Sequence, residues 1–488
     1  MPPTLITCLS RVQAFASAQH QTWYLVGGLL RDQLLGRPVS TSLNVDVAVP
    51  RGALELARAL AQDLHGAFVV LDDVACSARI VVTTDAGRIE LDISEFRAPT
   101  LAADLAARDF TINAMAITLA DWLQSPEQLH ALIDPLQGQQ ALARRQLIPC
   151  FPGTFEADPV RILRAFRFVA QLEFALDSSA ADLMRRAVGS LSRVSGERIR
   201  DELMAIFETA NAAGAMRALN ELGVLDVLIP ELGLGRGMEQ GGFHHLDVLG
   251  HQLETVAQAD RFLFDFAEFS EALRAPLTHY CAQQLVERRS RKGLIKLAGL
   301  LHDVGKPANR QVHDDGEIWF LGHEQTGAEL AAPIVERLRL ANREAEMVCL
   351  LVGHHLRPGF LSREPQLTRR AVYRFYKELG DHGPACLLTW WADRMATRGP
   401  QSRLDQLDQQ RARLEELLNA YFFQADEVVR PQRLIDGNQL MEALHLTSGP
   451  LVGELLELIE EAQAEGRLQT AADALLLARE TLEHRRHA

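Results

Sequence analysis

The strongest constraint on the fold of this chain is a change in hydrophobic periodicity near residue 155. Before that point, short apolar runs of strand type alternate with helical segments, and after it the spacing of apolar residues is helical. Strands gathered at one end of a chain and helices at the other are typical of the α+β class. We therefore predict a small domain with a mixed sheet, followed by a helical remainder.

The first 150 residues contain the strand and helix signals in detail. Strands are expected at four apolar runs: 22–26, 44–49, 78–84 and 88–94. Helices are expected where apolar residues recur at helical spacing: 29–36 and 53–64. Between the last two strands, Asp85-Ala86-Gly87 is typical of a hairpin turn.

Composition excludes several classes of protein. Hydrophobic residues make up 47% of the 488 residues, which supports buried cores and is atypical of disorder. No apolar run reaches about 18 residues, so we predict no membrane span, and the N-terminus does not resemble a signal peptide. The six cysteines include no CxxC pair, which indicates a reducing cytoplasm rather than a disulfide framework. A net charge of −14 argues against broad electrostatic binding to nucleic acid.

A pair of glycines, Gly27-Gly28, lies between the first expected strand and the first expected helix. Glycines there let the backbone approach a ligand, and the helix start offers free N–H groups to phosphate. Asp46 and Asp92 each lie on an expected strand between apolar neighbours. Carboxylates from neighbouring strands beside a phosphate site are the ligands that two Mg²⁺ ions need for nucleotidyl transfer. The alternative is that both aspartates simply face solvent.

A second set of candidate functional residues, all histidines and aspartates, is spread along the middle of the chain. Its members are His251, His302, Asp303, His323, His354, His355 and Asp393. Imidazole and carboxylate groups hold one or two divalent metals that activate water against a phosphoester. Lys306 follows His302 by one helical turn, where it is placed to meet a phosphate. The alternative is a helical bundle with structural histidines.

Four segments resemble, in their order, class II tRNA nucleotidyltransferases and bacterial poly(A) polymerases. They are YLVGGLLRDQLLG, NVDVAV, ARDFTINAMA and EADPVRILRAFRFVAQL. The ordered histidines and aspartates resemble the HD phosphohydrolase superfamily, a domain that many such nucleotidyltransferases contain. The resemblance implies a nucleotidyltransferase head, a helical neck and body with a nucleotide-reading helix, an HD-type metal domain and a helical, RNA-binding tail, at 1–150, 151–240, 241–400 and 401–488.

The resemblance also implies a role for each matching residue. Asp46 and Asp92 would be the catalytic carboxylates and, with Asn44, the Mg²⁺ ligands of the head. Asp158 and Arg161 would contact the Watson–Crick edge of the incoming base, because they offer it acceptors and a donor fork. The other residues expected to bind the nucleotide are Gly27, Gly28, Arg31, Asp32, Arg108, Asp109, Asn113, Arg164 and Arg167. The HD residues would bind a divalent metal whose identity the sequence leaves open.

The activity implied is addition of C and/or A residues to the 3′ end of tRNA, from CTP and ATP with Mg²⁺. A poly(A) polymerase, or an enzyme that adds only CC or only A, remains an open alternative. Asn44 stands where the family usually has the first Asp of Asp-x-Asp, and an amide removes a negative charge from a two-cation site. Other common family residues are replaced by Ala107, Gln139, Ala141 and Ala157. A second hypothesis is therefore an HD-type phosphohydrolase whose degenerate head only binds nucleotide or RNA.

Overall fold

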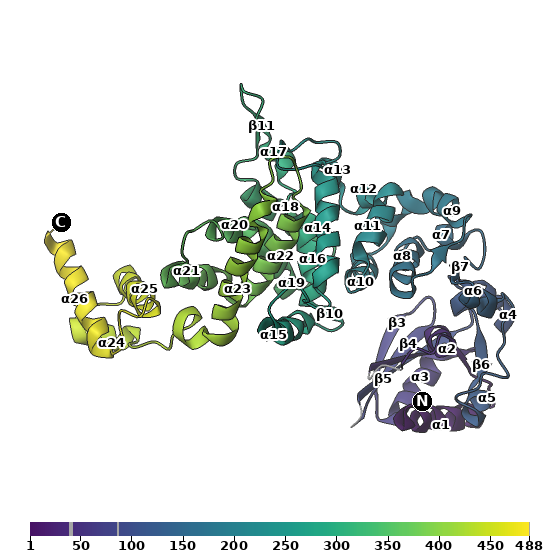
Figure 1. Ribbon diagram of the computed structural model, residues 1–488. Coiled ribbons are helices and arrows are strands. Elements are labelled where there is room, and N and C mark those ends of the chain that lie inside the picture. The colour runs from purple at the N-terminus through teal and green to yellow at the C-terminus, as the bar shows by residue number, and fades with distance from the viewer. Residues whose placement is uncertain (39–41, 85–86, 488) are drawn as a thin grey trace. The chain divides into compact units, whose positions relative to one another are not determined.

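The computed structural model describes residues 1–38, 42–84 and 87–487 (Figure 1). The chain divides into two compact units, Met1–Val194 and Ser195–Ala488. The predicted α+β class is confirmed, because a mixed sheet lies in the first unit and the rest is mainly helical. The boundaries expected at residues 150, 240 and 400 stay predictions.

A six-stranded sheet with the order β3-β4-β5-β2-β1-β6 forms the centre of the first unit. Its strands are β1 (Tyr24–Val26), β2 (Ser42–Val49), β3 (Ala67–Asp72), β4 (Ser77–Thr84), β5 (Gly87–Glu95) and β6 (Ala116–Thr118). The pair β2–β5 is parallel and the other pairs are antiparallel, so the sheet is mixed.

The four expected strands are present as β1, β2, β4 and β5, and the two expected helices as α2 (Gly28–Leu34) and α3 (Ala53–Leu64). Asp85 and Ala86 of the expected turn lie outside the described residues; on either side of them Thr84 pairs with Gly87. Within the first 100 residues, two described elements were not expected: helix α1 (Pro3–Ala18) and the largely exposed edge strand β3.

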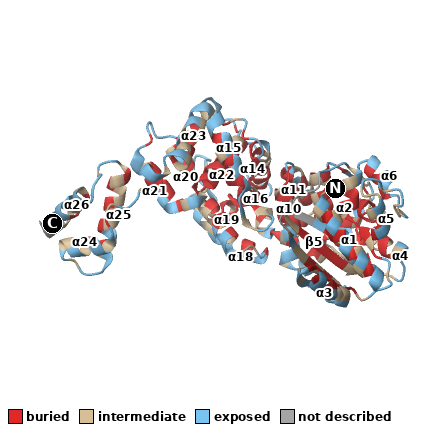
Figure 2. Cartoon of the chain, turned by 90° about the horizontal axis from the view of Figure 1, so that it is seen from below, coloured by how far each residue is buried: buried red, intermediate tan, exposed pale blue. Residues whose placement is uncertain are grey.

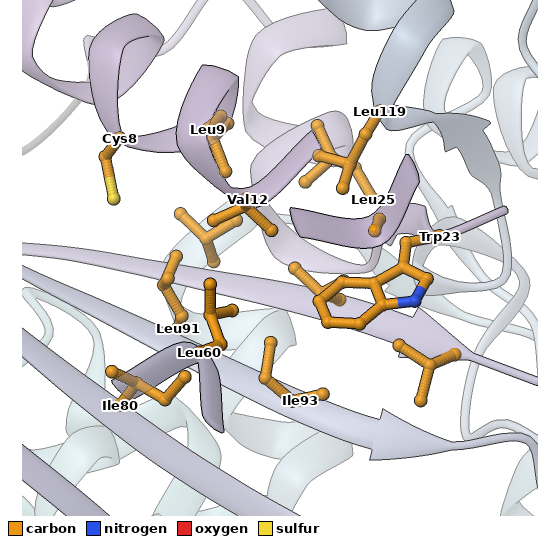
Figure 3. Close-up of a cluster of buried hydrophobic side chains, with 14 of the residues drawn as sticks. Cys8, Leu9, Val12, Trp23, Leu25, Leu60, Ile80, Leu91, Ile93 and Leu119 are labelled. Carbon is orange, nitrogen blue, oxygen red and sulfur yellow. The ribbon is translucent and has the colours of Figure 1, made fainter. Parts of the chain in front are cut away.

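Alternation along the strands separates the core of the first unit from its polar face. Val45 and Val47 from β2 belong to the same core as Leu91 and Ile93 from β5. Helices α1 and α3 complete this core with residues such as Leu9 and Leu60 (Figure 3). Successive strand residues point to opposite faces. The residues between these apolar positions, Asn44, Asp46, Glu90 and Asp92, therefore lie together on the opposite face.

Short helices follow the sheet in the first unit. They are α4 (Leu101–Ala106), η1 (Thr111–Asn113), α5 (Leu119–Gln124), α6 (Gly138–Ala143), α7 (Thr154–Ala157), α8 (Arg161–Leu172), α9 (Ala180–Ala187) and η2 (Val188–Arg193). A parallel pair, β7 (Gln146–Leu147) and β8 (Ala175–Leu176), joins the segment before α7 to the segment after α8.

The second unit is mainly helical, and α10, α14, α19 and α22 pack around α16, of which almost every residue is buried (Figure 2). Its helices are α10 (Gly196–Phe207), α11 (Ala212–Glu221), α12 (Val224–Leu228), α13 (Pro230–Gly233), α14 (Val248–Phe262), α15 (Glu271–Ala282), α16 (Arg291–Leu301), α17 (Lys306–Asn309), α18 (His323–Arg337), α19 (Asn342–His354), α20 (Arg357–Leu361), α21 (Arg369–Leu379), η3 (Gly380–His382), α22 (Gly383–Ala396), η4 (Leu404–Gln406), α23 (Leu407–Phe423), η5 (Ala425–Val429), α24 (Gly437–Leu444), α25 (Pro450–Ala464) and α26 (Ala471–His487).

Two short hairpins depart from the all-helical expectation for this part of the chain. They are β9 (Gln284–Val286) with β10 (Arg289–Ser290), and β11 (Gln311–Val312) with β12 (Ile318–Trp319). Strand pairs of two or three residues leave too short a periodic signal to detect in a sequence. Within the described ranges, no helix is long and apolar enough to cross a membrane.

The contact between α6 and η1 generates a prediction about stability. A Cβ at Gly138 would lie 2.3 Å from the carbonyl oxygen of Thr111 and 3.0 Å from Met115 Cγ, so the backbone would have to move. We expect Gly138→Ala to destabilise the first unit by about 1–3 kcal/mol, the usual cost of overpacking. Thermal unfolding of the full chain measures this change.

Gly189→Ala is the matched control in the same unit, because a Cβ there meets nothing within 4 Å. We expect it to be neutral or slightly stabilising, as for a glycine replaced inside a helix. Equal unfolding midpoints for the two variants would show that α6 is free to shift away from Thr111.

Candidate functional site

The polar face of the sheet forms the floor of a cavity of about 560 Å³. Gly27, Gly28, Arg31 and Asp32 reach it from the β1–α2 turn, Asn44 and Asp46 from β2, and Asp92 from β5. Arg108 and Asp109 come from the segment between α4 and η1, and Asn113 comes from η1 itself. Helix α8 contributes Arg161, Arg164 and Arg167. The structure thus brings together every residue predicted for the head except Asp158.

The glycine turn lies directly against Asp46. Gly27 has φ +75°, a left-handed conformation that side chains disfavour, and a Cβ on it would lie 2.7 Å from Asp46 Oδ2. The backbone N–H of Gly28 donates a hydrogen bond to the same carboxylate. This turn therefore requires glycine at position 27, both for its backbone angle and for the space that Asp46 occupies.

Asp46 and Asp92 are direct neighbours across the parallel pair β2–β5. Burial raises the pKa of Asp46, and the neighbouring Asp92 carboxylate raises it further, while Arg108, the Gly28 amide and Arg164 act in the opposite direction. Two carboxylates held side by side in a buried place favour a cation between them. Hard divalent ions prefer such oxygen ligands, so the donor set fits the metal expected for the head.

Asn44 lies on the same face as Asp46, two residues earlier on β2, and it also lines the cavity. Its partner in the strand register is Glu90, whose carboxylate is buried. The position is therefore one from which an oxygen ligand can reach the metal site, with an amide oxygen in place of a carboxylate.

A connected set of charged groups forms the wall above the aspartates. Arg31 makes a two-point hydrogen bond to Asp32, at 2.9 Å from each oxygen, and donates a third to Asn113 Oδ1 at 2.9 Å. Asp109 lies 3.3 Å from Arg164. Although burial acts in the opposite direction, Arg164 and the Phe110 amide hold the pKa of Asp109 below its usual value. The wall thus keeps Asp109 ionised and presents arginines to the cavity.

The two residues expected to contact the base lie at the start of α8. Arg161 Nε is 3.8 Å from Asp158 Oδ2, and its Nη groups lie 3.4 Å from the carbonyl oxygens of Ala107 and Arg108. Arg161 lines the cavity, whereas Asp158 does not belong to the described residues that line it. The structure therefore pairs the two residues but exposes only the arginine to the space.

The histidines and aspartates of the second unit converge in two buried groups. One group contains His251, His302 and Asp393, and the other contains Asp303, His323 and His355. In each group the three ligand atoms all lie within 4.8 Å of one another. The groups adjoin, since His302 Nε2 lies 3.1 Å from Asp303 Oδ2. Histidine nitrogens and carboxylate oxygens at these separations fit one or two divalent metals.

Three of these histidines are oriented by a backbone carbonyl three residues earlier in the chain. The Nδ1 atoms of His302, His323 and His355 lie 2.7–2.8 Å from the carbonyl oxygens of Gly299, Phe320 and Val352. A carbonyl only accepts, so each Nδ1 bears the proton and each Nε2 is left for a ligand. Burial, with His302 and His323 nearby, lowers the pKa of His355 to about 3, so its ring is neutral, the form that binds metals.

His354 does not join either group. It precedes His355 at the end of α19, and neighbouring residues on a helix point about 100° apart. Its ring is half-buried and lies 3.7 Å from Glu378 instead. Of the two adjacent histidines proposed as ligands, the structure brings only His355 to the metal groups.

Lys306 and His244 adjoin the histidine groups. Lys306 Nζ lies 2.6 Å from Asp303 Oδ2 and donates to Gln240 Oε1. The ring of His244, which the sequence analysis did not select, packs 4.5 Å from the ring of His251. Both residues line a cavity of about 720 Å³ that opens onto Asp303, His355 and Asp393.

Arg79 is a second residue that the sequence analysis missed. It makes a two-point hydrogen bond to Asp92, with Nε 2.7 Å from Oδ1 and Nη2 2.9 Å from Oδ2. The register of β4 and β5, in which Thr84 pairs with Gly87, places Arg79 directly opposite Asp92, whereas the turn expected at 85–87 would have placed residue 79 opposite residue 93.

Comparison with known protein families matches four parts of the chain. The poly A polymerase head domain matches residues 23–148, and the RNA and SrmB-binding site of polymerase A matches residues 173–234. The HD domain matches residues 266–377, and tRNA nucleotidyltransferase domain 2 matches residues 395–478. Nucleotidyltransferase and HD domains both depend on divalent metals, in agreement with the two donor sets.

Similar proteins extend this match over most of the chain. An A-adding tRNA nucleotidyltransferase of Deinococcus radiodurans is 35% identical over 457 residues, which cover 92% of this chain and 93% of that protein. A CC-adding tRNA nucleotidyltransferase of Thermus thermophilus is 33% identical, over 92% of this chain and 91% of that protein.

Solved structures show the same fold. A Thermotoga maritima CCA-adding enzyme complexed with tRNA aligns with a TM-score of 0.61 at 22% identity, over 99% of this chain and 96% of that one. A complex of a CCA-adding enzyme with ATP gives a TM-score of 0.64, also at 22% identity, over 99% and 96% of the two chains. Together with the head cavity and the HD residues, these relatives show that the chain belongs to the family of tRNA nucleotidyltransferases and is an enzyme with a nucleotidyltransferase head and an HD domain.

Proposed function

We propose that this enzyme adds C and/or A residues to the 3′ end of tRNA, from CTP or ATP and with Mg²⁺ in the head. One observation carries the proposal: the neighbouring Asp46 and Asp92 share a cavity with the glycine turn and the arginines of α8. The relatives named above include an A-adding and a CC-adding enzyme, so the product is the part of the proposal that needs a direct test.

In this proposal Asp46 and Asp92 hold the metal, with Asn44 as a neutral third ligand. A divalent ion held there would lower the cost of deprotonating the ribose hydroxyl and would stabilise negative charge on the phosphates. Gly27 and Gly28 let the triphosphate approach the backbone closely, and Arg31, Arg164 and Arg167 balance its charge. Arg161 donates to the base edge, oriented by Asp158.

The HD domain, the tail and the location complete the proposal. The two buried ligand groups favour a second function, metal-dependent hydrolysis of phosphoesters, with Lys306 beside them to bind phosphate.

We assign RNA binding to the tail at 401–488, which overlaps the match to tRNA nucleotidyltransferase domain 2. The six cysteines are all free thiols, which supports a reducing compartment such as the cytoplasm.

The decisive experiment offers the enzyme three tRNAs that end before CCA, after C and after CC. Each is incubated with CTP alone or ATP alone and with Mg²⁺, and the extended products are resolved on a gel. Addition of C to the first two, of A only to the third, or of both in turn distinguishes a CC-adding, an A-adding and a CCA-adding enzyme. Long A tracts would indicate a poly(A) polymerase, and no extension at all would favour the phosphohydrolase with a degenerate head.

Asn44 generates a prediction about metal dependence. Restoring a carboxylate with Asn44→Asp adds a charged ligand beside Asp46, so the Mg²⁺ concentration needed for half-maximal addition should fall and the rate should rise. Because a misplacement of about 1 Å at a reacting centre costs roughly a hundredfold in rate, the gain can approach that size. Initial rates of 3′ addition over a Mg²⁺ series measure both effects.

Asn44→Ala, which removes the amide oxygen as well, is the companion variant and should need more Mg²⁺ than the unaltered enzyme. If the unaltered enzyme extends tRNA briskly at low millimolar Mg²⁺ and neither variant changes the dependence, Asn44 is not a metal ligand.

The HD domain generates a separate prediction. His302→Ala combined with Asp303→Ala removes one ligand from each group, so the protein should lose its bound metal and any metal-dependent phosphatase or cyclic phosphodiesterase activity. Nucleotide addition should persist, because the head cavity lies in the other compact unit. Elemental analysis of the purified protein and hydrolysis assays with added divalent ions give the two readouts.

His354→Ala is the matched control, since it removes a neighbouring histidine that lies outside both groups. We expect it to retain the metal. Equal metal content in the unaltered protein and the double variant would overturn the assignment of these ligands.

A further inference from the structure

A row of three charged side chains crosses the polar face of the sheet. In the strand register Asp46 on β2 pairs with Asp92 on β5, and Asp92 pairs with Arg79 on β4. All three therefore lie at the same level and on the same face. Asp92 is the central member, with a carboxylate on one side and a guanidinium on the other.

All three guanidinium nitrogens of Arg79 contact carboxylates of the neighbouring strand β5. Nε and Nη2 bond the two oxygens of Asp92, and Nη1 lies 2.9 Å from Glu90 Oε2. A second arginine, Arg88, lies 2.9 Å from the other oxygen of Glu90. Glu90 thus has two cationic partners, whereas the two-point contact to Asp92 is made by Arg79.

Arg79 does not belong to the described residues that line the head cavity, although Asp92 does. Arg79 thus lies behind Asp92 as seen from the space where a metal and a triphosphate would bind. Because Arg79 contacts Asp92 from the side away from this space, it can influence a bound metal only through Asp92. It does so by fixing the direction in which the carboxylate oxygens of Asp92 point. The fork geometry matters here, because it fixes both oxygens at once.

We propose that Arg79 is a positioning residue of the head metal site, which holds the Asp92 carboxylate in the orientation that binds the divalent ion beside Asp46. The inference rests on the proposed function in one respect, that Asp46 and Asp92 bind the metal. It matters more in this chain than in one with a full Asp-x-Asp motif. Because Asn44 is neutral, the two carboxylates of the site are those of Asp46 and Asp92. If one of them is no longer held in the right orientation, a single well-placed anionic ligand remains.

The alternative is that Arg79 only balances the charge of Glu90 and Asp92 within the sheet. Charge balance and orientation of Asp92 can be distinguished by replacing Arg79 with lysine. Lysine keeps the positive charge but offers a point donor and no fork. A role in charge balance is restored by Arg79→Lys, whereas a role in orientation is not.

The test measures binding of Mn²⁺ alone to the full chain by electron paramagnetic resonance. The background carries His302→Ala and Asp303→Ala, so that binding reports on the head. We expect Arg79→Lys and Arg79→Met each to weaken Mn²⁺ binding about 10–100-fold, the usual effect of removing a group that orients a metal ligand. In the enzyme with its HD residues intact, added Mg²⁺ should restore most of the maximal rate of nucleotide addition to Arg79→Lys.

Two further variants separate orientation from folding. Arg88→Met removes the other guanidinium at Glu90 and should leave Mn²⁺ affinity within about twofold of the parent. Adding Glu90→Gln to Arg79→Met removes the buried carboxylate that has lost a partner, so this double variant should recover thermal stability without recovering Mn²⁺ affinity.

The outcomes distinguish the possible failures. Parent-like Mn²⁺ affinity in Arg79→Lys, or an equal loss in Arg88→Met, would overturn the role of Arg79 while leaving the metal site in place. If the parent itself binds no Mn²⁺ in the head, the proposed metal site is wrong and the role of Arg79 is wrong with it.

Discussion

The parallel pairing of β2 with β5 is the constraint on which the head depends. Burial of Val45, Val47, Leu91 and Ile93 on one face fixes the register of the two strands, because a shift by one residue would turn these side chains into solvent. The same register brings Asp46 and Asp92 together on the opposite face. The hydrophobic core thereby provides the energy that holds two mutually repelling carboxylates side by side, and the metal chemistry proposed for the head uses that arrangement.

In the second unit, packed helices likewise hold several ionisable side chains close together. Its six metal-ligand candidates come from different helices or helix ends, and each of His302, His323 and His355 has its ring fixed by a carbonyl one turn earlier. Burial of so many ionisable groups is costly unless they are paired or bind metal. In this cluster the acids and histidines compensate one another, and Lys306 adds a positive charge beside Asp303. The packing of the bundle around α16 therefore holds a preformed donor set.

Local signals predicted much of this molecule, and long-range contacts supplied the rest. The expected strands and helices of the first 100 residues appear where periodicity placed them, and Gly27, Asp46 and Asp92 meet in one cavity. Edge strand β3 escaped detection because it is mostly exposed and so lacks a clear alternation. Which of two adjacent histidines faces the metal groups depends on how α19 is rotated in the bundle, and sequence spacing alone does not determine that rotation. The pairing of Arg79 with Asp92 was not predicted, because the turn expected at 85–87 pairs residue 79 with residue 93, and the observed register of β4 and β5 differs from it by one residue.

The division into two compact units, each with buried residues of its own, has a consequence for how such a protein changes over time. Substitutions that erode one donor set leave the ligands of the other in place, because the residues of each set lie within a single unit. The amide at position 44 therefore leaves the histidine cluster unaltered, and the reverse holds for a substitution in that cluster. The head site and the histidine cluster are therefore inherited together in one polypeptide, but each can lose its ligands independently of the other.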